Sequence, residues 1–394
     1  MTLPIFTFVA LVVYYRYFYG VGIYNSPGTR KQESSTVSCC KNPDCVRCQR
    51  YRYVQESAKR KLSWILRDLE SRDPTTFSAL NKRVPNAILR SGNHGKEYGK
   101  STSYYRGNGN SMQATFLQDP TILMVLDLPS KEIVTGWHQD ACKYLKQRQT
   151  RAIVSEALYF LGDGKICDEI DDPKQSHHTS SSSPIVSSDD SKWTVNDSSP
   201  QGDWRVFQIL NQGVWNPILL RDGCSNKEEP CRKLLELIQN IPGLLNNCLF
   251  GNAFISKIYP GTSIEPHCGP TNIRHRLQFL LKLPHVHPSA GERDADQKPK
   301  LSLSVGHENS IFWNMENDTF VFDDSFVHSV TYPDEEPGTD GRITGIENSG
   351  KGNLPKKDSL ARMVLIVDLW HPGLQDVEMK LLRDLYPPYT TSRT

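Results

Sequence analysis

Hydrophobic residues in this chain are concentrated in short runs in the C-terminal half, and turns rich in Gly, Pro and Asn separate these runs. From residue 204 onward, their length and spacing are typical of successive antiparallel strands. The predicted strands are Trp204–Leu210, Ala253–Tyr259, Arg274–Leu283, Leu301–Val305, Thr319–Phe322 and Met363–Trp370. Leu234–Ile241 has the apolar spacing of a helix. We therefore expect a mainly β domain with flanking helices, arranged as a sandwich or barrel.

The pattern before residue 204 predicts helices joined by polar segments. Tyr53–Leu69 is charged and helical in spacing, and the composition of Ser78–Asn110 is typical of a linker. Leu123–Leu128 is a short strand-like run, and apolar residues from Leu145 to Leu161 follow a helical period. Asp168–Gln201 is acidic and rich in Ser. Because it has few apolar residues whose burial could offset the entropy of ordering, we expect a disordered insertion there.

The N-terminus carries an apolar run, Leu3–Tyr24, that is about as long as the roughly 20 residues a helix needs to cross a bilayer. Arg16 is the one charged residue in this run and would be unfavourable inside a bilayer. The Tyr residues in the second half of the run suit a membrane interface. We predict an uncleaved membrane anchor. A signal peptide or a buried helix is the alternative, although neither a basic n-region nor a small-residue cleavage site is visible.

These patterns together predict six segments. They are an anchor (1–25), a cysteine-containing stem and linker (26–120), peripheral helical elements (121–167), a disordered insertion (168–203), a β domain (204–376) and a C-terminal tail (377–394).

Composition changes the picture in two ways. The chain has 394 residues, of which 37% are hydrophobic, and a mean hydropathy of -0.51, so the core must be localised. The net charge is only +2 and no basic run occurs, so we expect no nucleic-acid partner.

Four of the ten cysteines lie in a short basic segment, where they could bind zinc, form disulfides or be palmitoylated. These are Cys39, Cys40, Cys45 and Cys48.

The orientation in the membrane is left open by the residues themselves. Arg30, Lys31 and Lys41 follow the apolar run, which favours a cytosolic C-terminal side. The many cysteines and two glycosylation sequons, at Asn196 and Asn317, favour a secretory lumen. We predict a single-pass membrane protein of the endoplasmic reticulum with a lumenal C-terminal domain.

Two histidines and one arginine are the candidate functional residues of the β domain. His267 and His328 are each expected at the end of a strand, and Arg362 begins an apolar strand. Two imidazoles can bind Fe(II), and an inward-pointing guanidinium can bind a dicarboxylate. This combination is what an iron oxygenase with a dicarboxylate cosubstrate requires. The alternative is a β-sandwich without chemistry, because a lone histidine is more often structural and the chain has 11 of them.

Longer strings around these residues carry a family resemblance. HCGPTNIRHR, FDDSFVH and RMVLIVDLWHP, together with GDWRVFQILNQG and LFGNAFISKIYPGT, resemble the motifs of the aspartyl/asparaginyl β-hydroxylase family and of its short membrane-anchored members. The resemblance covers about residues 204–374 and is weaker upstream from residue 128. It implies a double-stranded β-helix (a jelly-roll or cupin-like fold). It also implies Fe(II) and 2-oxoglutarate as cofactors, and hydroxylation of the β-carbon of Asp or Asn in protein substrates, possibly EGF-like.

The resemblance implies that His267 and His328 bind the iron. Most related oxygenases supply a carboxylate two residues after the first histidine, where this chain has Gly269 and where water fills the position in this family. Asp324 is the candidate for orienting that water as a catalytic residue. The alternative role of Asp324 is to form the turn at the strand end.

For 2-oxoglutarate, the resemblance implies that Arg362 binds the distal carboxylate with help from Ser256 and Arg276. Gln278 stands where the family usually has a histidine, so it can donate a hydrogen bond but carries no charge. This departure leaves open a catalytically silent binding module of the same family. Cys224 and Cys231 match in spacing a disulfide-bearing loop of the family, and Thr331–Asp358 is a polar insertion between His328 and the Arg362 strand.

Overall fold

The computed structural model describes residues 51–80, 82–91, 118–161, 193–195, 201–220, 229–283, 301–306, 309–312, 318–333 and 360–388. The chain divides into two compact units, Met1–Val37 and Ser38–Thr394, and every described residue belongs to the second. The predicted anchor, the four clustered cysteines, Cys224 and both sequon asparagines lie outside the described residues. Among the described residues, no helix is both long and apolar enough to cross a membrane.

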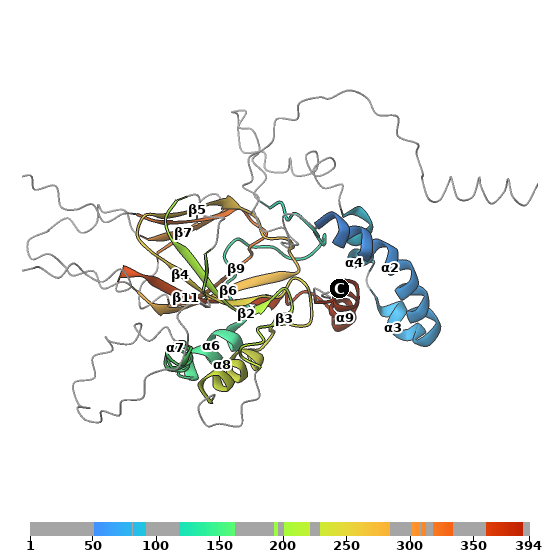
Figure 1. Cartoon of the computed structure of the whole chain (residues 1–394). Coiled ribbons are helices and arrows are strands. Elements are labelled where there is room, and N and C mark those ends of the chain that lie inside the picture. The colour runs from blue at the N-terminus through green and yellow to red at the C-terminus, as the bar shows by residue number, and fades with distance from the viewer. Residues whose placement is uncertain are drawn as a thin grey trace, which may run out of the picture. The chain divides into compact units, whose positions relative to one another are not determined.

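A seven-stranded sheet forms the centre of the described fold (Figure 1). Its strands lie in the order β1-β2-β4-β11-β6-β9, and β3 pairs with β2. The strands are β1 (Thr194–Val195), β2 (Trp204–Asn211), β3 (Val214–Trp215), β4 (Ala253–Ile258), β6 (Arg274–Lys282), β9 (Thr319–Phe322) and β11 (Arg362–Trp370). All nine residues of β11 are buried, because both faces of this central strand are covered. All the pairings in the sheet are antiparallel.

A second sheet of four strands, ordered β5-β10-β7-β8, lies over one face of the first (Figure 1). Its strands are β5 (Thr262–His267), β7 (Ser302–Val305), β8 (Asn309–Phe312) and β10 (His328–Tyr332). One apolar cluster joins the two layers, with Leu280 and Val364 from the large sheet and Leu303, Val305 and Val330 from the small one. We call the face of the large sheet that carries this cluster its inner face. Alternate residues of each strand therefore point toward the small sheet.

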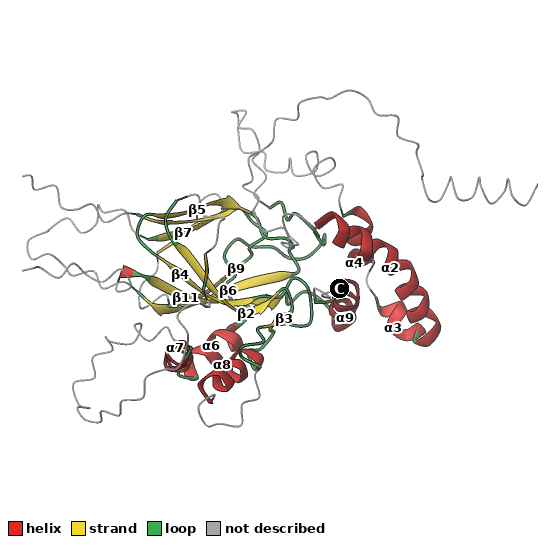
Figure 2. Ribbon diagram, viewed as in Figure 1, coloured by secondary structure: helices red, strands yellow, loops and turns green. Residues whose placement is uncertain are grey.

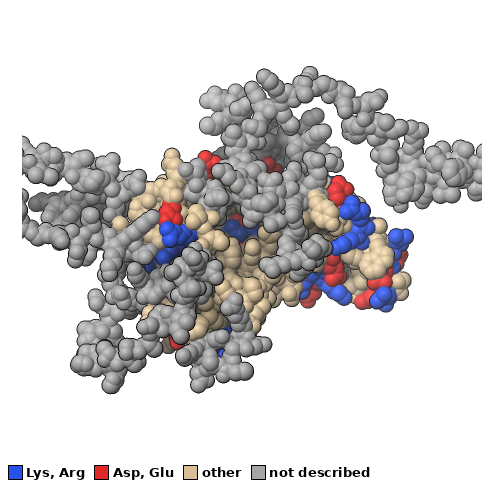
Figure 3. Space-filling view, in the orientation of Figure 1, with Lys and Arg blue, Asp and Glu red and all other residues tan. Residues whose placement is uncertain are grey.

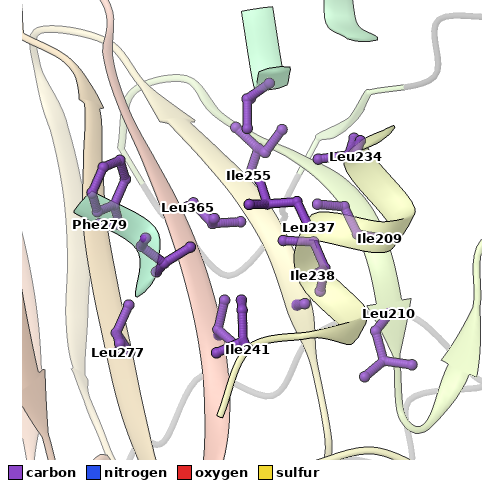
Figure 4. Packing of buried hydrophobic residues seen from close by; sticks show 14 of the residues in the cluster. Ile209, Leu210, Leu234, Leu237, Ile238, Ile241, Ile255, Leu277, Phe279 and Leu365 are labelled. Atoms are coloured by element: carbon purple, nitrogen blue, oxygen red, sulfur yellow. The ribbon is translucent and has the colours of Figure 1, made fainter. Parts of the chain in front are cut away.

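Helices α6 (Gln139–Gln147), α7 (Thr150–Phe160) and α8 (Glu229–Gln239) cover the opposite, outer face of the large sheet (Figure 2). Figure 4 shows Leu234, Leu237 and Ile238 of α8 packed toward Ile255 and Leu365 of the sheet. The apolar residues of α8 recur at helical spacing, so one side of the helix is buried in this cluster. The mainly β architecture with flanking helices is confirmed.

A second group of helices consists of α2 (Tyr51–Arg72), α3 (Pro74–Ala79), α4 (Arg83–Arg90) and α9 (Asp376–Leu385). Their apolar sides share one core, and Arg83 of α4 forms an ion pair with the buried Glu378 of α9 at 2.7 Å. Figure 3 shows Lys and Arg interspersed with Asp and Glu over these helices. The predicted linker from residue 78 and the predicted C-terminal tail are therefore wrong where α4 and α9 occur. In both helices, buried apolar residues recur at helical spacing.

Other predicted elements need smaller corrections. Leu123–Leu128 forms no strand, because its backbone bonds to the loop at Pro270 and to the Asn272 side chain. The helix predicted up to Leu161 is two helices, interrupted at Gln149, where φ is +52°. Thr194–Val195, inside the predicted disordered insertion, forms strand β1 on the edge of β2. Strands β3, β5, β8 and β10 are absent from the predicted strands, although His267 and His328 were expected at strand ends.

Candidate metal and carboxylate site

His267 and His328 lie side by side on the small sheet. They end β5 and begin β10 respectively, and they are direct partners in the antiparallel register of these strands. The ring centroids are 4.2 Å apart. The sequence predicted two histidines at strand ends, and the structure brings them together from positions 61 residues apart (328 minus 267).

Each of these imidazoles is oriented by a backbone carbonyl two residues earlier. His267 Nδ1 lies 2.8 Å from Glu265 O, and His328 Nδ1 lies 2.9 Å from Phe326 O. A carbonyl oxygen can only accept a hydrogen bond, so Nδ1 carries a proton in both rings, and in the neutral form of each ring Nε2 carries the lone pair. Histidines that bind metals commonly donate the other ring N–H to a carbonyl or carboxylate in this way. The two residues therefore fit a pair of Nε2 metal ligands.

No third protein ligand joins this pair within the described residues. Groups of three or more His, Cys, Asp or Glu side chains able to hold a metal ion do not occur there.

Gly269, at the position of the usual carboxylate ligand, lies against the carboxylate of Asp324. A Cβ atom at position 269 would come within 2.5 Å of Asp324 Cγ and Oδ2. The Gly269 N–H also donates to the Asp324 backbone carbonyl at 2.5 Å. Any side chain at 269 would have to displace a buried carboxylate, so the space of the missing ligand side chain is already filled from the loop before β10.

Two arginines hold the Asp324 carboxylate in place. Arg274 Nη2 and Arg276 Nη1 lie 2.7 and 3.2 Å from Asp324 Oδ2, and both arginines also form ion pairs with Asp368. Burial alone would raise the pKa of Asp324, but the two guanidinium groups outweigh it and hold that pKa well below its usual range. Asp324 is therefore charged at neutral pH and is held in place beside Gly269. We call Arg274, Arg276, Asp324 and Asp368 the buried ion network.

The turn at this strand end includes Asp324, and the side chain of its neighbour Asp323 holds the turn. Asp323 Oδ1 accepts hydrogen bonds from the backbone N–H and the hydroxyl of Ser325, at 3.0 and 2.5 Å. Burial raises the pKa of Asp323 to about 7, against the opposing effect of these hydrogen bonds. The two adjacent carboxyl groups are therefore held in different ways, one by a turn and one by two arginines.

Ser256, Gln278 and Arg362 all lie on the inner face of the large sheet, which faces the histidine pair. They alternate with outer-face residues of β4, β6 and β11, and Ser256 is the register partner of Val364. His328 lies on the inner side of the small sheet, where its ring contacts Phe322 of β9 with centroids 5.3 Å apart. The predicted inward direction of Arg362 is confirmed, since its side chain is buried in this layer.

Neutral side chains contact two of these polar groups. Arg362 Nη2 donates to Gln278 Oε1 at 2.9 Å, and Trp204 Nε1 donates to Ser256 Oγ at 3.1 Å. Burial lowers the pKa of Arg362 to about 9, so the guanidinium is still charged at neutral pH. Arg276, which was also predicted to assist 2-oxoglutarate, is placed in the buried ion network.

Sequence reasoning missed several residues of this region. Arg274 and Asp368 received no role, although charged residues inside apolar strands are the signal that could have found them. Asn252, which donates to Asp368 Oδ2 at 2.8 Å, had no such signal. Trp204 was noted only as the start of a strand.

Comparisons with known proteins agree with the motifs of the sequence. A sequence profile of the Aspartyl/Asparaginyl beta-hydroxylase family matches residues 148–338, which include both histidines and end before Arg362. Aspartate beta-hydroxylase domain-containing protein 2 of Xenopus tropicalis is 32% identical over 196 residues, covering 50% of this chain and 40% of that protein. The Rattus norvegicus protein of the same name is 27% identical over 362 residues, covering 89% of this chain and 76% of that protein.

More distant similarities extend to a hydroxylase and to one solved structure. Aspartyl/asparaginyl beta-hydroxylase of Mus musculus is 28% identical over 182 residues, which are 46% of this chain and 18% of that protein. A Pseudomonas putida prolyl-4-hydroxylase shares 11% identity and a TM-score of 0.24, with 59% of this chain and 90% of that chain covered. This structural likeness is too low to bear on the fold. From the profile and the curated relatives, the chain is similar to the aspartyl/asparaginyl β-hydroxylase family, in agreement with its motifs.

Proposed function

We propose that this chain is an Fe(II)- and 2-oxoglutarate-dependent dioxygenase that hydroxylates the β-carbon of Asp or Asn residues in protein substrates. The observation that carries the proposal is the pair of adjacent imidazoles whose Nδ1–H groups are both bound to backbone carbonyls. Such a pair offers two preoriented Nε2 lone pairs on the side of the small sheet that faces Arg362.

The chain's own residues divide the work of this reaction. His267 and His328 would hold the iron, which supplies the oxidising chemistry together with 2-oxoglutarate and oxygen when bound. Arg362 binds the distal carboxylate of 2-oxoglutarate, and the Ser256 hydroxyl, whose oxygen already accepts from Trp204, has its proton left to donate. Asp324 keeps a fixed negative charge beside Gly269, where it can orient a water molecule.

The substrate and the location belong to the same proposal. The family name refers to hydroxylation of aspartyl and asparaginyl residues, so we propose a protein or peptide substrate, with EGF-like segments as one class. We also propose that the two facing sheets form a double-stranded β-helix, and that a membrane anchor holds the domain in the lumen of the endoplasmic reticulum.

Turnover of 2-oxoglutarate by the purified chain, measured with added Fe(II) and no protein substrate, tests the proposal. We expect slow decarboxylation that His267→Ala and His328→Ala each abolish. Turnover in either variant equal to that of the unaltered chain would exclude this function.

The second candidate is a binding module that does not oxidise its partner, which the uncharged Gln278 beside Arg362 favours. An absence of turnover, combined with metal binding and with capture of acidic or EGF-like peptides, would support this candidate instead.

A further inference from the structure

The segment 118–125, which we call the strap, contacts the loop that precedes His328. Gln118 forms an isolated antiparallel bridge with Phe326, and its side-chain Nε2 donates to Ser325 Oγ at 2.8 Å. Phe326 O is also the acceptor for His328 Nδ1. The strap therefore pairs with the residue that orients the His328 ring.

The other end of the strap contacts the loop that follows His267. The N–H groups of Ile122 and Leu123 both donate to Pro270 O, at 3.0 and 3.1 Å. The Asn272 side chain exchanges two further hydrogen bonds of 2.8 Å with the backbone of the strap. One short segment therefore joins the loops that lie beside the two histidines.

The strap is itself fixed to the second group of helices. The side chains of Ile122 and Leu123 are buried in the core that α2, α4 and α9 share. Gln55 of α2, which is also buried, donates from Nε2 to Ile122 O at 2.8 Å. Because the strap is packed on helices on one side and bonded to both loops on the other, it provides a rigid support for them.

The two histidines lie where the ladder between β5 and β10 ends. On one side of His267 and His328 the two strands pair, and on the other side both chains leave the small sheet as loops. The ends of paired elements open more readily than their middles. A metal site needs its ligands held within roughly 0.5 Å of the productive geometry. At this end of the ladder, the hydrogen bonds of the strap take the place of strand pairing.

We propose that the strap sets the separation of the His267 and His328 rings, and that Gln118 is a positioning residue that acts through the loop before His328. The strap precedes residue 148, where the match to the family profile begins, so that similarity does not include this role. The inference rests on the proposed function and deepens it, because it names what holds the two iron ligands at a fixed distance.

The test measures binding of Mn(II) and Co(II) to the purified full chain, so that no turnover is needed. Gln118→Leu keeps an uncharged side chain of similar size but removes the donor to Ser325. We expect it to weaken Mn(II) binding roughly tenfold, as for other changes behind a metal ligand. At saturating Co(II), the visible absorption spectrum should also shift, because it reports the geometry of the ligands.

A second variant acts from the helix side of the strap. Gln55→Leu removes the donor to Ile122 O and touches neither histidine loop directly. Because its effect passes through the strap, we expect Mn(II) binding to weaken less, by about threefold, with a Co(II) spectrum shifted in the same direction.

Asn216 provides a matched control. It follows β3 and donates from Nδ2 to Gln208 O of β2 at 2.7 Å. Asn216→Leu therefore removes a comparable amide hydrogen bond from the large sheet rather than from the strap. It should leave the Mn(II) affinity and the Co(II) spectrum as they are in the unaltered chain.

The outcomes separate the inference from the function on which it rests. If the unaltered chain binds neither ion, the proposed function and the inference fail together. If it binds both ions, and Gln118→Leu and Gln55→Leu match Asn216→Leu in affinity and spectrum, the role of the strap is overturned while the function stands. Weaker binding with an unshifted Co(II) spectrum would show a loss of folded protein and would also overturn the inference.

Discussion

Two groups of histidines lie in this fold, and they use their ring nitrogens in opposite ways. His267 and His328 occupy the small sheet, where each Nδ1 donates to a backbone carbonyl and each Nε2 keeps a lone pair. The second group is a trio on the outer side of the large sheet, formed by His138, His275 and His371. The pair is proposed to bind a metal ion, whereas the rings of the trio contact one another and the backbone.

The hydrogen bonds of the trio show this directly. His371 Nε2 donates to Pro129 O at 2.8 Å, and its Nδ1 accepts from the Gly373 N–H at 2.9 Å. His138 Nε2 and His275 Nδ1 lie 3.0 Å apart, so one of them donates to the other. Trp137 stacks on the His275 ring with centroids 5.5 Å apart. The contacts of His371 require a neutral imidazole, because one of its ring nitrogens donates and the other accepts.

The difference shows that histidine number and proximity do not identify a metal site. The trio has more rings than the pair, yet four of its ring nitrogens bond to each other or to the backbone, and His275 Nε2 has no hydrogen-bond partner among the described residues. What distinguishes the pair is that the same nitrogen of both rings, Nδ1, donates to a backbone carbonyl.

The strongest test of the difference between the pair and the trio is to remove one histidine of the pair. His267→Ala or His328→Ala should lower the affinity for Mn(II) or Fe(II) at least about a hundredfold, because one of two protein ligands is lost. Isothermal titration with Mn(II) measures the affinity. His371→Gln is the control from the trio, and it should bind the metal as the unaltered chain does. Loss of metal binding in His371→Gln would mean that the two groups are not functionally distinct.

The candidate site was predictable from sequence because its residues lie in recognisable strings at the ends of strands. His267 and His328 stand beside turn residues, and Arg362 begins an apolar run. The pairing of β5 with β10 that joins the histidines was not predicted, because both strands are short and mix polar with apolar residues. Antiparallel pairing between distant segments leaves no local signal in the chain.

The helices α4 and α9 were missed for a different reason. Each is short, and each lies in a segment whose Gly, Ser, Pro or charged residues suggest a linker or a tail. Burial of Ile88 and Leu382 against partners far away in sequence stabilises these helices. Tertiary packing therefore overrode local composition.

The next largest effect concerns the strand that separates the two histidine groups. On β6, Arg274 and Arg276 face the buried ion network, and His275 between them faces the trio. Asp368→Asn keeps the side-chain shape but removes the charge that both arginines share, and we expect it to lower the free energy of unfolding by about 3 to 5 kcal/mol. Guanidinium chloride denaturation measures this change.

Asp203→Asn is the matched control, because Asp203 forms a partly exposed ion pair with Arg205 at 2.8 Å. Its loss should cost less than about 1 kcal/mol. Equal effects of the two substitutions would contradict the assignment of a stabilising role to the buried network.

A smaller effect is expected at Gly269, beside the histidine pair. Gly269→Ala would place a methyl group within 2.5 Å of the Asp324 carboxylate, which two arginines hold in place. We expect a loss of about 1 to 3 kcal/mol in the free energy of unfolding, as for other overpacked sites, together with weaker Mn(II) binding. Thermal unfolding and Mn(II) titration measure both effects. Unchanged values for both would mean that the Asp324 carboxylate can move away from Gly269 at no cost.

The smallest expected effect is the response of the trio to acid. Burial lowers the pKa of His138 to about 4, and the neighbouring His371 contributes in the same direction. Burial also lowers the pKa of His275 and His371, with smaller contributions from neighbouring histidines and from Arg83. The unfolded chain, with imidazole pKa values near 6.5, therefore binds more protons than the folded chain as the pH falls from about 6.5 toward 4. The stability that the neutral trio contributes is fully present above that pH range and is lost on acidification.

From His138 alone we expect the free energy of unfolding to be about 1 to 2 kcal/mol lower at pH 5 than at pH 7, a value reduced for partial solvent access. Urea denaturation at the two pH values measures the difference, and His138→Gln should make it smaller. If His138→Gln leaves the pH dependence unaltered, the trio titrates like exposed histidines, and its contrast with His267 and His328 is lost.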